Sequence, residues 1–377
     1  MARVPPRKTA IPRAADIAAV LVEWFARAAR DLPWRRTLDP YAIWVSEAML
    51  QQTQVATVIP YWNRWMAELP DVRSLAHAPA DKVLKLWEGL GYYRRARHLH
   101  AAARQIVEAR DGSLPSDLEG WLALPGIGRY TAGAIVSIAF NHPAPILDGN
   151  VMRVLSRLLA LPGDAGQRAF RDSLWSAAGR LVAAASDMDA PHALPHAPLV
   201  RLSGPCSALN QSLMELGATT CTPASPHCHA CPVSERCRAR KTRRTADFPR
   251  PAPRPPVAHR TMAAVLWQSS GRWLVLRRAE GTVNGGLWEF PTVECNAGED
   301  PRASLAAWLG IDAARLSPAG TVRHAITRYR IEQHLFRLAD AAIDATMPPG
   351  AEWKPWKDLP SLPWTSAHRR ALQLITT

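Results

Sequence analysis

The chain has 377 residues, of which 47% are hydrophobic, and its 46 Lys and Arg against 32 Asp and Glu give a formal net charge of +14. That length is too great for one ordinary hydrophobic core and predicts two domains or three. A protein this basic is expected to meet a polyanion, either nucleic acid or an acidic membrane surface, and charge alone does not choose between them.

Neither a membrane span nor a signal peptide is apparent in the sequence. The longest apolar stretch without charges, Tyr130–Leu147, is interrupted by Asn141, His142 and two prolines. The basic amino terminus has an apolar run, Ile17–Val22, that is too short for a signal-peptide core. We therefore expect a cytoplasmic protein in a reducing compartment, with no membrane partner.

From about Ala14 to Cys237 the chain has the pattern of helices separated by prolines. Asp39 and Pro40 suit an N-cap and a first helical position, so a helix is expected over Tyr41–Gln52. Glu47 lies in the middle of this helix. A solvent-facing glutamate is the simple interpretation, but its neighbours are unusually apolar, and such surroundings raise the pKa of a carboxyl group.

A glycine-rich turn, Leu124-Pro125-Gly126-Ile127-Gly128-Arg129, separates two helical runs, Asp117–Leu124 and Arg129–Asn141. Glycines allow a sharp turn, and the N–H groups that open the second helix can hold a phosphate. Because the turn follows a helix and not a strand, a dinucleotide-binding fold is disfavoured. The pattern predicts a helix-hairpin-helix element that grips a nucleic-acid backbone without reading its sequence.

Asp148 stands just before a further helical run, Val151–Leu161. Taken alone it is most simply an N-cap, and a functional carboxylate is the alternative. The segment Ser186–Ser207 is rich in Pro, His and Ala and is expected to be a surface insertion.

Four of the six cysteines lie within 17 residues at the spacing C-x6-C-x2-C-x5-C: Cys221, Cys228, Cys231 and Cys237. Four thiolates this close can surround one metal centre, either tetrahedral zinc or an iron–sulfur cube. Disulfides are the alternative, but nothing in the sequence indicates an oxidising compartment. The spacing therefore predicts a metal or cluster site and leaves the metal open.

The composition changes after the last of these cysteines. Residues 238–256 hold seven Lys or Arg and five Pro, which predicts a stiff, extended, basic linker, either a plain tether or a contact for phosphates. Beyond it we expect strands at Thr261–Gln268, Trp273–Arg278, Leu287–Val293 and Thr327–Leu338, and helices at Arg302–Leu309 and Ser366–Ile375. The predicted organisation is a helical region over residues 14–237, a linker over 238–258 and a smaller α+β domain over 259–377.

The hairpin, the aspartate about twenty residues after it and the four cysteines together resemble the endonuclease III superfamily of DNA glycosylases. Within it the chain is similar to the MutY-type adenine DNA glycosylases over about residues 20–370. The motifs that carry the resemblance are LPWR (Leu32–Arg35), SEAMLQQTQVATVIPYW (Ser46–Trp62), LWEGLGYYRRARHLH (Leu86–His100), LPGIGRYTAGAI (Leu124–Ile135), ILDGNVMRVL (Ile146–Leu155) and NQSLMELGATTC (Asn210–Cys221).

This resemblance implies a mainly α helix-hairpin-helix glycosylase region with a 4Fe-4S cluster on the four cysteines. It also implies an α+β Nudix-like C-terminal domain that recognises 8-oxoguanine. The implied partner is double-stranded DNA that contains an A:8-oxoguanine or A:G mispair, bound by a monomer at the bacterial nucleoid.

The resemblance also assigns catalytic roles. Glu47 is then the acid that protonates adenine, and Asp148 is the carboxylate that stabilises or attacks the oxocarbenium-like sugar. Tyr130 and Asn150 match residues that orient these carboxylates and the sugar. Tyr130 also stands where strand-cleaving relatives carry a catalytic lysine, and Met152 replaces another lysine. We therefore expect a monofunctional enzyme that leaves an abasic site and forms little borohydride-trappable adduct.

Eight residues are expected to contact DNA. Three match residues that fill the base stack once the target base has been flipped out, at a cost of a few kcal/mol: Gln51, Gln52 and Tyr92. Three belong to the hairpin that would hold a phosphate: Leu124, Gly126 and Gly128. Two lie at the turn with which the family reads the oxidised base, often as Phe-Ser-His: Thr327, which keeps a hydroxyl group, and Arg328.

The C-terminal domain departs from a catalytic Nudix enzyme. GGLWEFP (Gly285–Pro291) resembles the family signature, but Pro301–Ile311 lacks the glutamates that ligate metal in a Nudix box. A nucleotide pyrophosphatase is therefore not expected. Two other functions stay open: a thymine glycosylase that acts on G·T mispairs, and a non-catalytic iron–sulfur protein that binds DNA or senses redox state.

Overall fold

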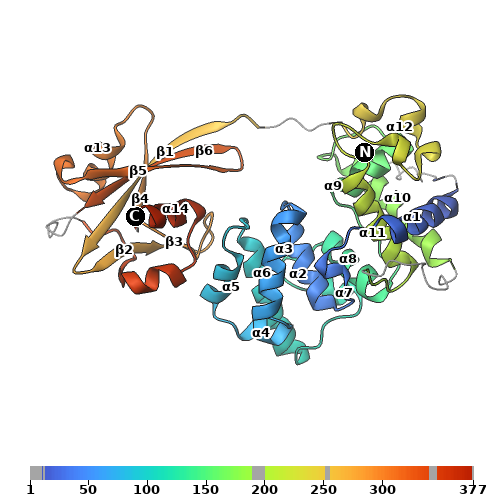
Figure 1. The fold of residues 1–377 in the computed structure, drawn as a ribbon, viewed down its shortest axis with the longest axis horizontal. Helices are drawn as coiled ribbons and strands as arrows, with labels where there is room; N and C mark the ends of the chain where they lie inside the picture. The colour runs from blue at the N-terminus through green and yellow to red at the C-terminus, as the bar shows by residue number, and fades with distance from the viewer. Residues whose placement is uncertain (1–10, 12, 189–199, 251–254, 339–345, 376–377) are drawn as a thin grey trace, which may run out of the picture. The chain divides into compact units, whose positions relative to one another are not determined.

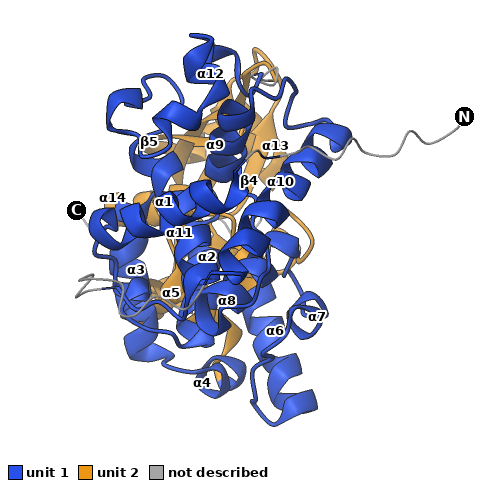
Figure 2. Ribbon diagram, turned by 90° about the vertical axis from the view of Figure 1, so that its right-hand side faces the viewer, with its two compact units in different colours: residues 1–77, 98–253 blue, residues 78–97, 254–377 orange. Residues whose placement is uncertain are grey.

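The computed structural model describes residues 11, 13–188, 200–250, 255–338 and 346–375. They form two compact units (Figure 2). The helical unit comprises residues 1–77 and 98–253, and the sheet unit comprises residues 78–97 and 254–377. Among the described residues, no helix is long and apolar enough to cross a membrane. Most of the predicted insertion, residues 189–199, lies outside the described part of the chain.

The helical unit is built of α-helices joined by short loops (Figure 1). They are α1 (Ala14–Ala28), α2 (Pro40–Leu50), α3 (Val55–Glu68), α4 (Val72–His77), most of α6 (Arg94–Arg110), α7 (Leu118–Leu122), α8 (Arg129–Phe140), α9 (Gly149–Leu159), α10 (Arg168–Ser186), α11 (Pro205–Thr219) and α12 (Arg238–Lys241). Helix α11 is buried along nearly its whole length and packs against α1, α8, α9 and α10, so it is the centre of this core.

Helix α2 begins as the sequence predicts. Oδ1 of Asp39 accepts a hydrogen bond of 3.0 Å from the N–H of Tyr41, and Pro40 occupies the first helical position. Every residue from Tyr41 to Met49 is buried, so the helix has no solvent face there. The interpretation of Glu47 as a solvent-facing glutamate is therefore wrong.

The region expected to be an extended linker begins as folded structure. Residues 238–241 form α12, and Thr245–Asp247 forms a 3-10 turn. The side chain of Phe248 is buried, and its carbonyl accepts a hydrogen bond of 3.0 Å from Nε of Arg157. The polar composition of the segment did not predict this anchoring. One buried phenylalanine and one main-chain acceptor are enough to hold the segment.

The sheet unit contains a seven-stranded mixed sheet. Its strands are β1 (Ala258–Ser269), β2 (Arg272–Arg277), β3 (Trp288–Glu289), β4 (Thr292–Cys295), β5 (Ser317–Ile326), β6 (Tyr329–Leu338) and β7 (Ala351–Pro355). The main order is β3-β2-β1-β6-β5, with β4 paired to β1 and β7 to β2. Strands β1 and β6 run parallel, and the other pairs are antiparallel.

Alternate residues of β1 build the two faces of this sheet, as the period of a strand requires. Val265 and Trp267 belong to a core with Leu305 and Leu309 of α13 (Pro301–Leu309). Leu266 belongs to the opposite core, which includes residues of α14 (Ser366–Leu374). The sheet is thus covered by a helix on each face, and the predicted α+β class is confirmed.

Two details of the sheet differ from the sequence prediction. The run Leu287–Val293 is two short strands, because Pro291 interrupts the pairing between β3 and β4. Strand β5 was missed. It contains Pro318 and Gly320, has a bulge between them, and is mostly exposed, so it lacks the alternating apolar pattern of a half-buried strand.

Candidate active site

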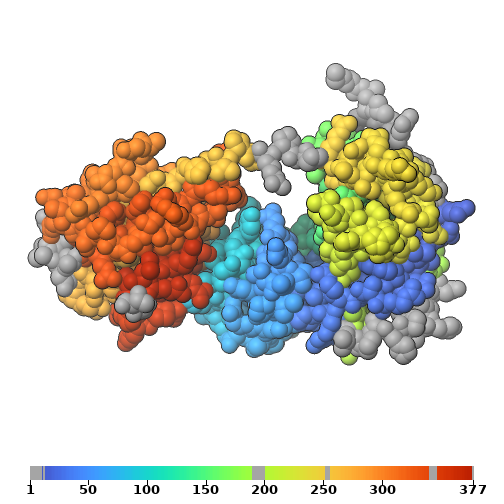
Figure 3. Space-filling view, turned by 45° about the horizontal axis from the view of Figure 1, so that its top comes forward, coloured from blue at the N-terminus to red at the C-terminus, as the bar shows by residue number. Residues whose placement is uncertain are grey.

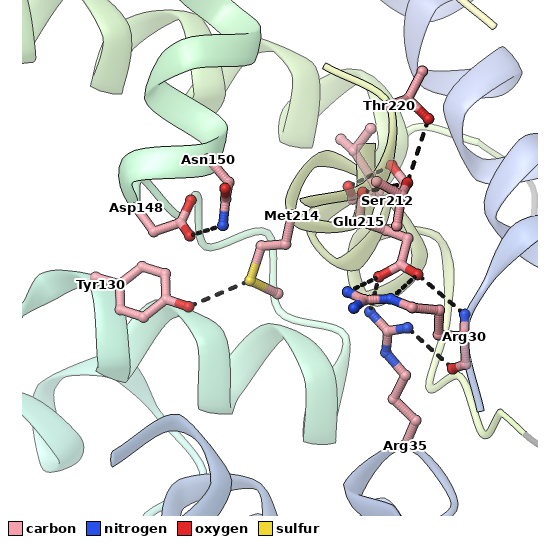
Figure 4. Close-up of polar contacts among 11 residues, drawn as sticks. Arg30, Arg35, Tyr130, Asp148, Asn150, Ser212, Met214, Glu215 and Thr220 are labelled. Atoms are coloured by element: carbon pink, nitrogen blue, oxygen red, sulfur yellow. Dashed lines mark hydrogen bonds and ion pairs between the residues drawn. The ribbon is translucent and has the colours of Figure 1, made fainter. Parts of the chain in front are cut away.

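A pocket of about 560 Å³ in the helical unit is lined by residues of α2, α8, α9 and α11. It contains all four predicted catalytic residues: Glu47, Tyr130, Asp148 and Asn150. The helices that carry them are separated by up to about a hundred residues of sequence, so the fold is what brings these side chains together. Figure 4 shows the polar contacts of this region.

Glu47 is a buried carboxyl group of the pocket, with 5% of its surface exposed. Burial raises its pKa to about 7, and the negative charge of Asp148 acts in the same direction. The hydrogen bond from Tyr130 and the charge of Arg35 act to lower it. About half of the molecules then carry a protonated Glu47 at pH 7, against about one in five hundred for a free glutamate.

Asp148 is both the N-cap of α9 and a group of the pocket. Oδ1 accepts a hydrogen bond of 2.7 Å from the N–H of Val151, and Oδ2 accepts one of 3.0 Å from Nδ2 of Asn150. Burial raises the pKa of Asp148, while these hydrogen bonds and the charge of Arg153 oppose the rise. The two interpretations of this residue are therefore compatible.

Tyr130 contacts both Glu47 and Met214, and Figure 4 shows its contact with Met214. Its phenol donates to Oε2 of Glu47 at 2.7 Å and lies 3.3 Å from Sδ of Met214. Burial, together with the negative charges of Glu47 and Asp148, raises the pKa of this phenol well above its ordinary value. Tyr130 is therefore a hydrogen-bond donor throughout the neutral range.

Asn150 is held from the side opposite to Asp148. Its Oδ1 accepts a hydrogen bond of 2.8 Å from Nη2 of Arg153. The same guanidinium donates to the carbonyl of Gly217 at 2.8 Å and, through Nε, to the carbonyl of Cys221 at 2.7 Å. Arg153 thus joins the orientation of Asn150 and Asp148 to the first residue of the cysteine-rich loop.

Besides Arg153, three charged residues of the pocket wall were not predicted: Arg30, Arg35 and Glu215. Glu215 is fully buried, and its carboxylate lies 2.7 Å from Nε of Arg30 and 2.8 Å from Nη2 of Arg35 (Figure 4). Burial acts to raise the pKa of Glu215, but the two arginines outweigh it and lower the pKa to about 2. Arg35 and Glu215 lie within the quoted motifs, yet a motif cannot show that side chains 180 residues apart form a pair.

The hairpin adopts the predicted tight turn. Gly126 has φ +75°, and a Cβ at this position would lie 2.2 Å from the ring of His98, so no larger residue fits. Gly128 is the N-cap of α8 and has open space around it. The side chain of Leu124 is buried, so only its main chain is available to a ligand.

The other predicted DNA-binding residues divide between the two units. Gln51 and Gln52 line the pocket at the end of α2, where Gln52 has φ +58°. Tyr92, Thr327 and Arg328 belong to the sheet unit. Thr327 and Arg328 form the two-residue turn between β5 and β6, and Thr327 is in the left-handed conformation with φ +49°.

The four cysteines of the motif line one small cavity of about 30 Å³, and none of the six cysteines forms a disulfide. Within the described ranges, no group of three or more His, Cys, Asp or Glu side chains is arranged to hold a metal ion. Arg157 fixes the first part of the loop. It is buried, lies 3.5 Å from Sγ of Cys221 and donates to the carbonyls of Thr222 and Pro223 at 2.7 and 2.8 Å.

Comparison with known proteins agrees with both parts of this structure. Residues 45–179 match the model of the HhH-GPD superfamily of base excision DNA repair proteins, and residues 262–374 match the NUDIX domain. The adenine DNA glycosylase of Mus musculus is 35% identical over 96% of this chain and 78% of that protein. The adenine DNA glycosylase of Homo sapiens is 35% identical over 88% of this chain and 69% of that protein. The one of Schizosaccharomyces pombe is 30% identical over 84% of this chain and 80% of that protein.

The chain belongs to the adenine DNA glycosylase family. The predicted helix-hairpin-helix glycosylase fold with a Nudix-like C-terminal domain is thereby confirmed. As a member of the family the protein is a base excision repair DNA glycosylase, a hydrolase whose partner is DNA.

The sequence prediction for the Nudix-like domain concerned the carboxylates of one segment, most of which forms helix α13. Its helix α13 has the sequence PRASLAAWL and carries no carboxylate. Divalent cations at phosphates are held by carboxylate oxygens.

Proposed function

We propose that this protein excises adenine that is mispaired with 8-oxoguanine or guanine in duplex DNA and leaves an abasic site. The observation that carries the proposal is the arrangement of Glu47, Tyr130 and Asp148 around one pocket. A carboxyl group with a pKa of about 7 can exist as the acid, and a second carboxylate lies in the same pocket.

The chemistry follows from these two groups. Adenine is a poor leaving group until a ring nitrogen is protonated, and Glu47 supplies this proton. Breaking the bond between adenine and C1′ leaves positive charge on the sugar, which the carboxylate of Asp148 stabilises. Water then adds to C1′ and gives up a proton, which restores the acid form of Glu47.

The same pocket supports a monofunctional enzyme. A Schiff base at C1′ needs an amine, and the residue after the hairpin is Tyr130, whose phenol is committed to Glu47. Met152 stands where another family lysine would lie. Borohydride should therefore trap little or no covalent adduct with DNA.

We include a 4Fe-4S cluster on the four cysteines in the proposal. The four cysteines line one common cavity, and Arg157 donates to the carbonyls of Thr222 and Pro223 in the loop between the first two of them. Such a cluster would be held by the four cysteines and would close the loop 221–237 next to α12, whose N-cap is Cys237. Iron and sulfide analysis of the purified protein tests this, with Cys228→Ser as the variant that should lose both.

The remaining parts of the proposal concern the base opposite adenine, the oligomeric state and the location in the cell. The Nudix-like domain would read 8-oxoguanine at the turn that carries Thr327 and Arg328. The protein would act as a monomer in the cytoplasm, at the bacterial nucleoid, which suits the unpaired state of its six cysteines.

The test is a single-turnover excision assay on duplexes that carry adenine opposite 8-oxoguanine, guanine or cytosine, with a G·T duplex beside them. Alkali then reveals abasic sites. We expect rapid adenine release opposite 8-oxoguanine and slower release opposite guanine. Release of thymine from G·T would instead favour a thymine glycosylase, and binding without release from any duplex would favour a non-catalytic DNA-binding protein.

Two variants connect the assay to the residues. Glu47→Gln and Asp148→Asn keep the shape of each side chain and remove its charge and acidity. Both should bind the duplex and fail to excise adenine. Normal excision by either variant would remove that residue from the mechanism.

A further inference from the structure

Part of the glycosylase sequence folds with the Nudix-like domain. Residues 78–97, which fall inside the region 45–179 matched by the glycosylase family model, belong to the sheet unit with residues 254–377. They comprise α5 (Ala80–Trp87), the loop 88–93 and the first turn of α6. In Figure 3 the light blue and cyan residues of this part of the chain lie against the red C-terminal residues.

The centre of this contact is the carboxylate of Glu88, which is 2% exposed. Oε1 accepts a hydrogen bond of 2.8 Å from the N–H of Trp364, and Oε2 accepts one of 2.9 Å from Nη1 of Arg369. Nζ of Lys85 lies 2.9 Å from the same Oε2 and also donates to the carbonyl of Leu362 at 2.9 Å. A buried carboxylate with this many donors fixes its own main chain to the partner segment.

Further contacts surround this one. Nη2 of Arg277 lies 2.7 Å from Oδ1 of Asp81, and Arg97 donates to the carbonyl of Gly285. A Cβ added at Gly286 would lie 3.4 Å from Cδ1 of Leu84, so α5 also packs closely on the GGLWEFP turn. The segment is thus held at both ends and in the middle.

Glu88 opens a loop that is itself rigid. Nε1 of Trp87 donates to the carbonyl of Gly91 at 3.1 Å, and the N–H of Gly89 donates to Oη of Tyr93 at 3.1 Å. Nη2 of Arg95 reaches the carbonyls of residues 90 and 91 at 3.2 and 3.0 Å. A displacement of Glu88 therefore moves the loop as a body.

Tyr92 is the exposed aromatic residue of this loop. Its side chain is 51% exposed, and its φ of +49° lies in the left-handed region that tyrosine seldom adopts. The guanidinium of Arg95 lies 5.6 Å from the centre of its ring. An exposed aromatic side chain on a strained, tied loop is prepared for contact with a base.

We propose that Glu88 is a positioning residue that fastens the Tyr92 loop to the Nudix-like domain. Insertion of Tyr92 into the base stack then depends on how that domain is held on DNA. The proposal rests on the proposed function, which assigns Tyr92 and the turn with Thr327 to DNA contacts. Tyr92 and the turn with Thr327 and Arg328 then move together, because both belong to one compact unit.

A mutant cycle with Tyr92 tests the proposal. Glu88→Gln and Arg369→Gln are each combined with Tyr92→Ala, and two quantities are measured on a duplex with adenine opposite 8-oxoguanine. One is the single-turnover rate, and the other is the fluorescence of 2-aminopurine next to the 8-oxoguanine, which increases on unstacking. Loss of one hydrogen bond to a charged group should lower the rate about tenfold when Tyr92 is present.

The decisive comparison is made in the Tyr92→Ala background. If Glu88 acts through Tyr92, Glu88→Gln has little further effect there on either the rate or the fluorescence. A residue that only supports the fold would lower both by the same factor in both backgrounds, and this result would overturn the proposal. Glu23→Gln, which breaks an exposed ion pair with Arg27 in α1, should change neither quantity.

Two provisions keep the outcome clear. If Glu88→Gln fails to fold, Arg369→Gln carries the test, because the Arg369 side chain is 51% exposed and its removal leaves no void. If the wild-type protein excises no adenine, the proposed function fails on that result alone. The fluorescence cycle then still decides whether Glu88 governs insertion of Tyr92.

Discussion

The phenol of Tyr130 donates a hydrogen bond of 2.7 Å to the buried carboxylate of Glu47. Burial raises the pKa of Glu47, and this hydrogen bond limits the rise, since it stabilises the ionised form. The result is a pKa of about 7, near the pH at which a general acid is most useful. The hydrogen bond from Tyr130 therefore adjusts the pKa of Glu47 as well as the orientation of its carboxyl group.

This relationship predicts the pH dependence of excision. Because the acid form of Glu47 is required, the single-turnover rate should fall as pH rises through about 7 and approach a tenfold loss per pH unit above it. In Tyr130→Phe the stabilisation of the carboxylate is lost, so the pKa of Glu47 rises and the descending limb moves to higher pH. Rate–pH profiles of the two proteins check this.

The control is a protein in which the acid itself is absent. Glu47→Gln should have only residual activity without a descending limb near neutral pH. If Tyr130→Phe has a limb at the same pH as the wild type, or at a lower pH, the hydrogen bond does not set the acidity of Glu47.

Glu215 predicts a contribution to stability that acid removes. Its pKa in the folded protein is about 2, below the ordinary value of 4.5. The stabilisation is complete above pH 4.5 and is lost as pH falls towards 2, by about 3 kcal/mol in the free energy of unfolding. Urea unfolding of the wild type at a series of pH values should show this loss in addition to that of other carboxylates.

Glu215→Gln is the variant for this prediction. It leaves Arg35 buried without its partner, so the free energy of unfolding at pH 7 should fall by about 3–5 kcal/mol. Its acid-dependent loss should also be smaller than that of the wild type. Glu23→Gln, at an exposed ion pair, should change the free energy by less than about 1 kcal/mol. Equal effects of the two variants would contradict the role of Glu215.

The sequence predicted most elements and the residues of the proposed catalytic pocket, but not the side chains that support them. Glu47, Tyr130 and Asp148 were named because they lie in motifs that resemble those of a known family. The hairpin and a helix start also mark the positions of Tyr130 and Asp148. Glu215 was missed because its arginine partners are distant in sequence, and no local pattern records such pairing. The burial of Glu47 was only suggested, since an apolar helix can be buried on one side or on all sides.

Supports made of main-chain contacts are still harder to predict. Arg153 and Arg157 read as ordinary helix residues, yet each is used to bind carbonyl groups of the cysteine loop. The anchored start of the linker was hidden in the same way, because its hydrogen bonds from Arg157 and to Gly163 depend on the packing of α9. The composition of a segment indicates its solubility and flexibility. It does not predict which side chain will donate a hydrogen bond to a main-chain carbonyl group.

Gly217 allows a prediction about the close approach of α11 and α9. A Cβ at this position would lie 2.5 Å from Cβ of Asn150, so Gly217→Ala must displace Asn150 or the helix. Since Asn150 orients Asp148, we expect the single-turnover rate to fall at least about tenfold, which corresponds to a disturbance of about 1.4 kcal/mol. DNA binding should persist, because the hairpin is unchanged.

A second helical glycine provides the matched control. A Cβ at Gly179 in α10 would lie 4.0 Å from its nearest neighbour, Cγ of Pro145, which is ordinary contact. Gly179→Ala should keep full activity and raise the free energy of unfolding by roughly 0.5–1 kcal/mol, since alanine favours a helix over glycine. Full activity in Gly217→Ala would show that Asn150 tolerates the displacement.

Arg243 and Arg244 follow α12 and give different predictions although they are adjacent. Nε of Arg244 lies 2.7 Å from Oδ2 of Asp247, and its guanidinium lies 5.6 Å from the centre of the Phe248 ring. Arg243 is exposed, and within the described part of the chain no ion pair is found for it. A contact with DNA phosphate is therefore expected from Arg243 more than from Arg244.

The measurement is the dependence of DNA affinity on salt concentration. If Arg243 neutralises one phosphate, Arg243→Gln should reduce the slope of log K against log salt by about 0.9. Arg244→Gln should reduce this slope less, because the charge of Arg244 is already balanced by Asp247. In the variant the unpaired Asp247 is exposed to solvent, so its repulsion of DNA is weak. Equal slopes for the wild type and Arg243→Gln would mean that this segment does not contact phosphates and serves as an anchor alone.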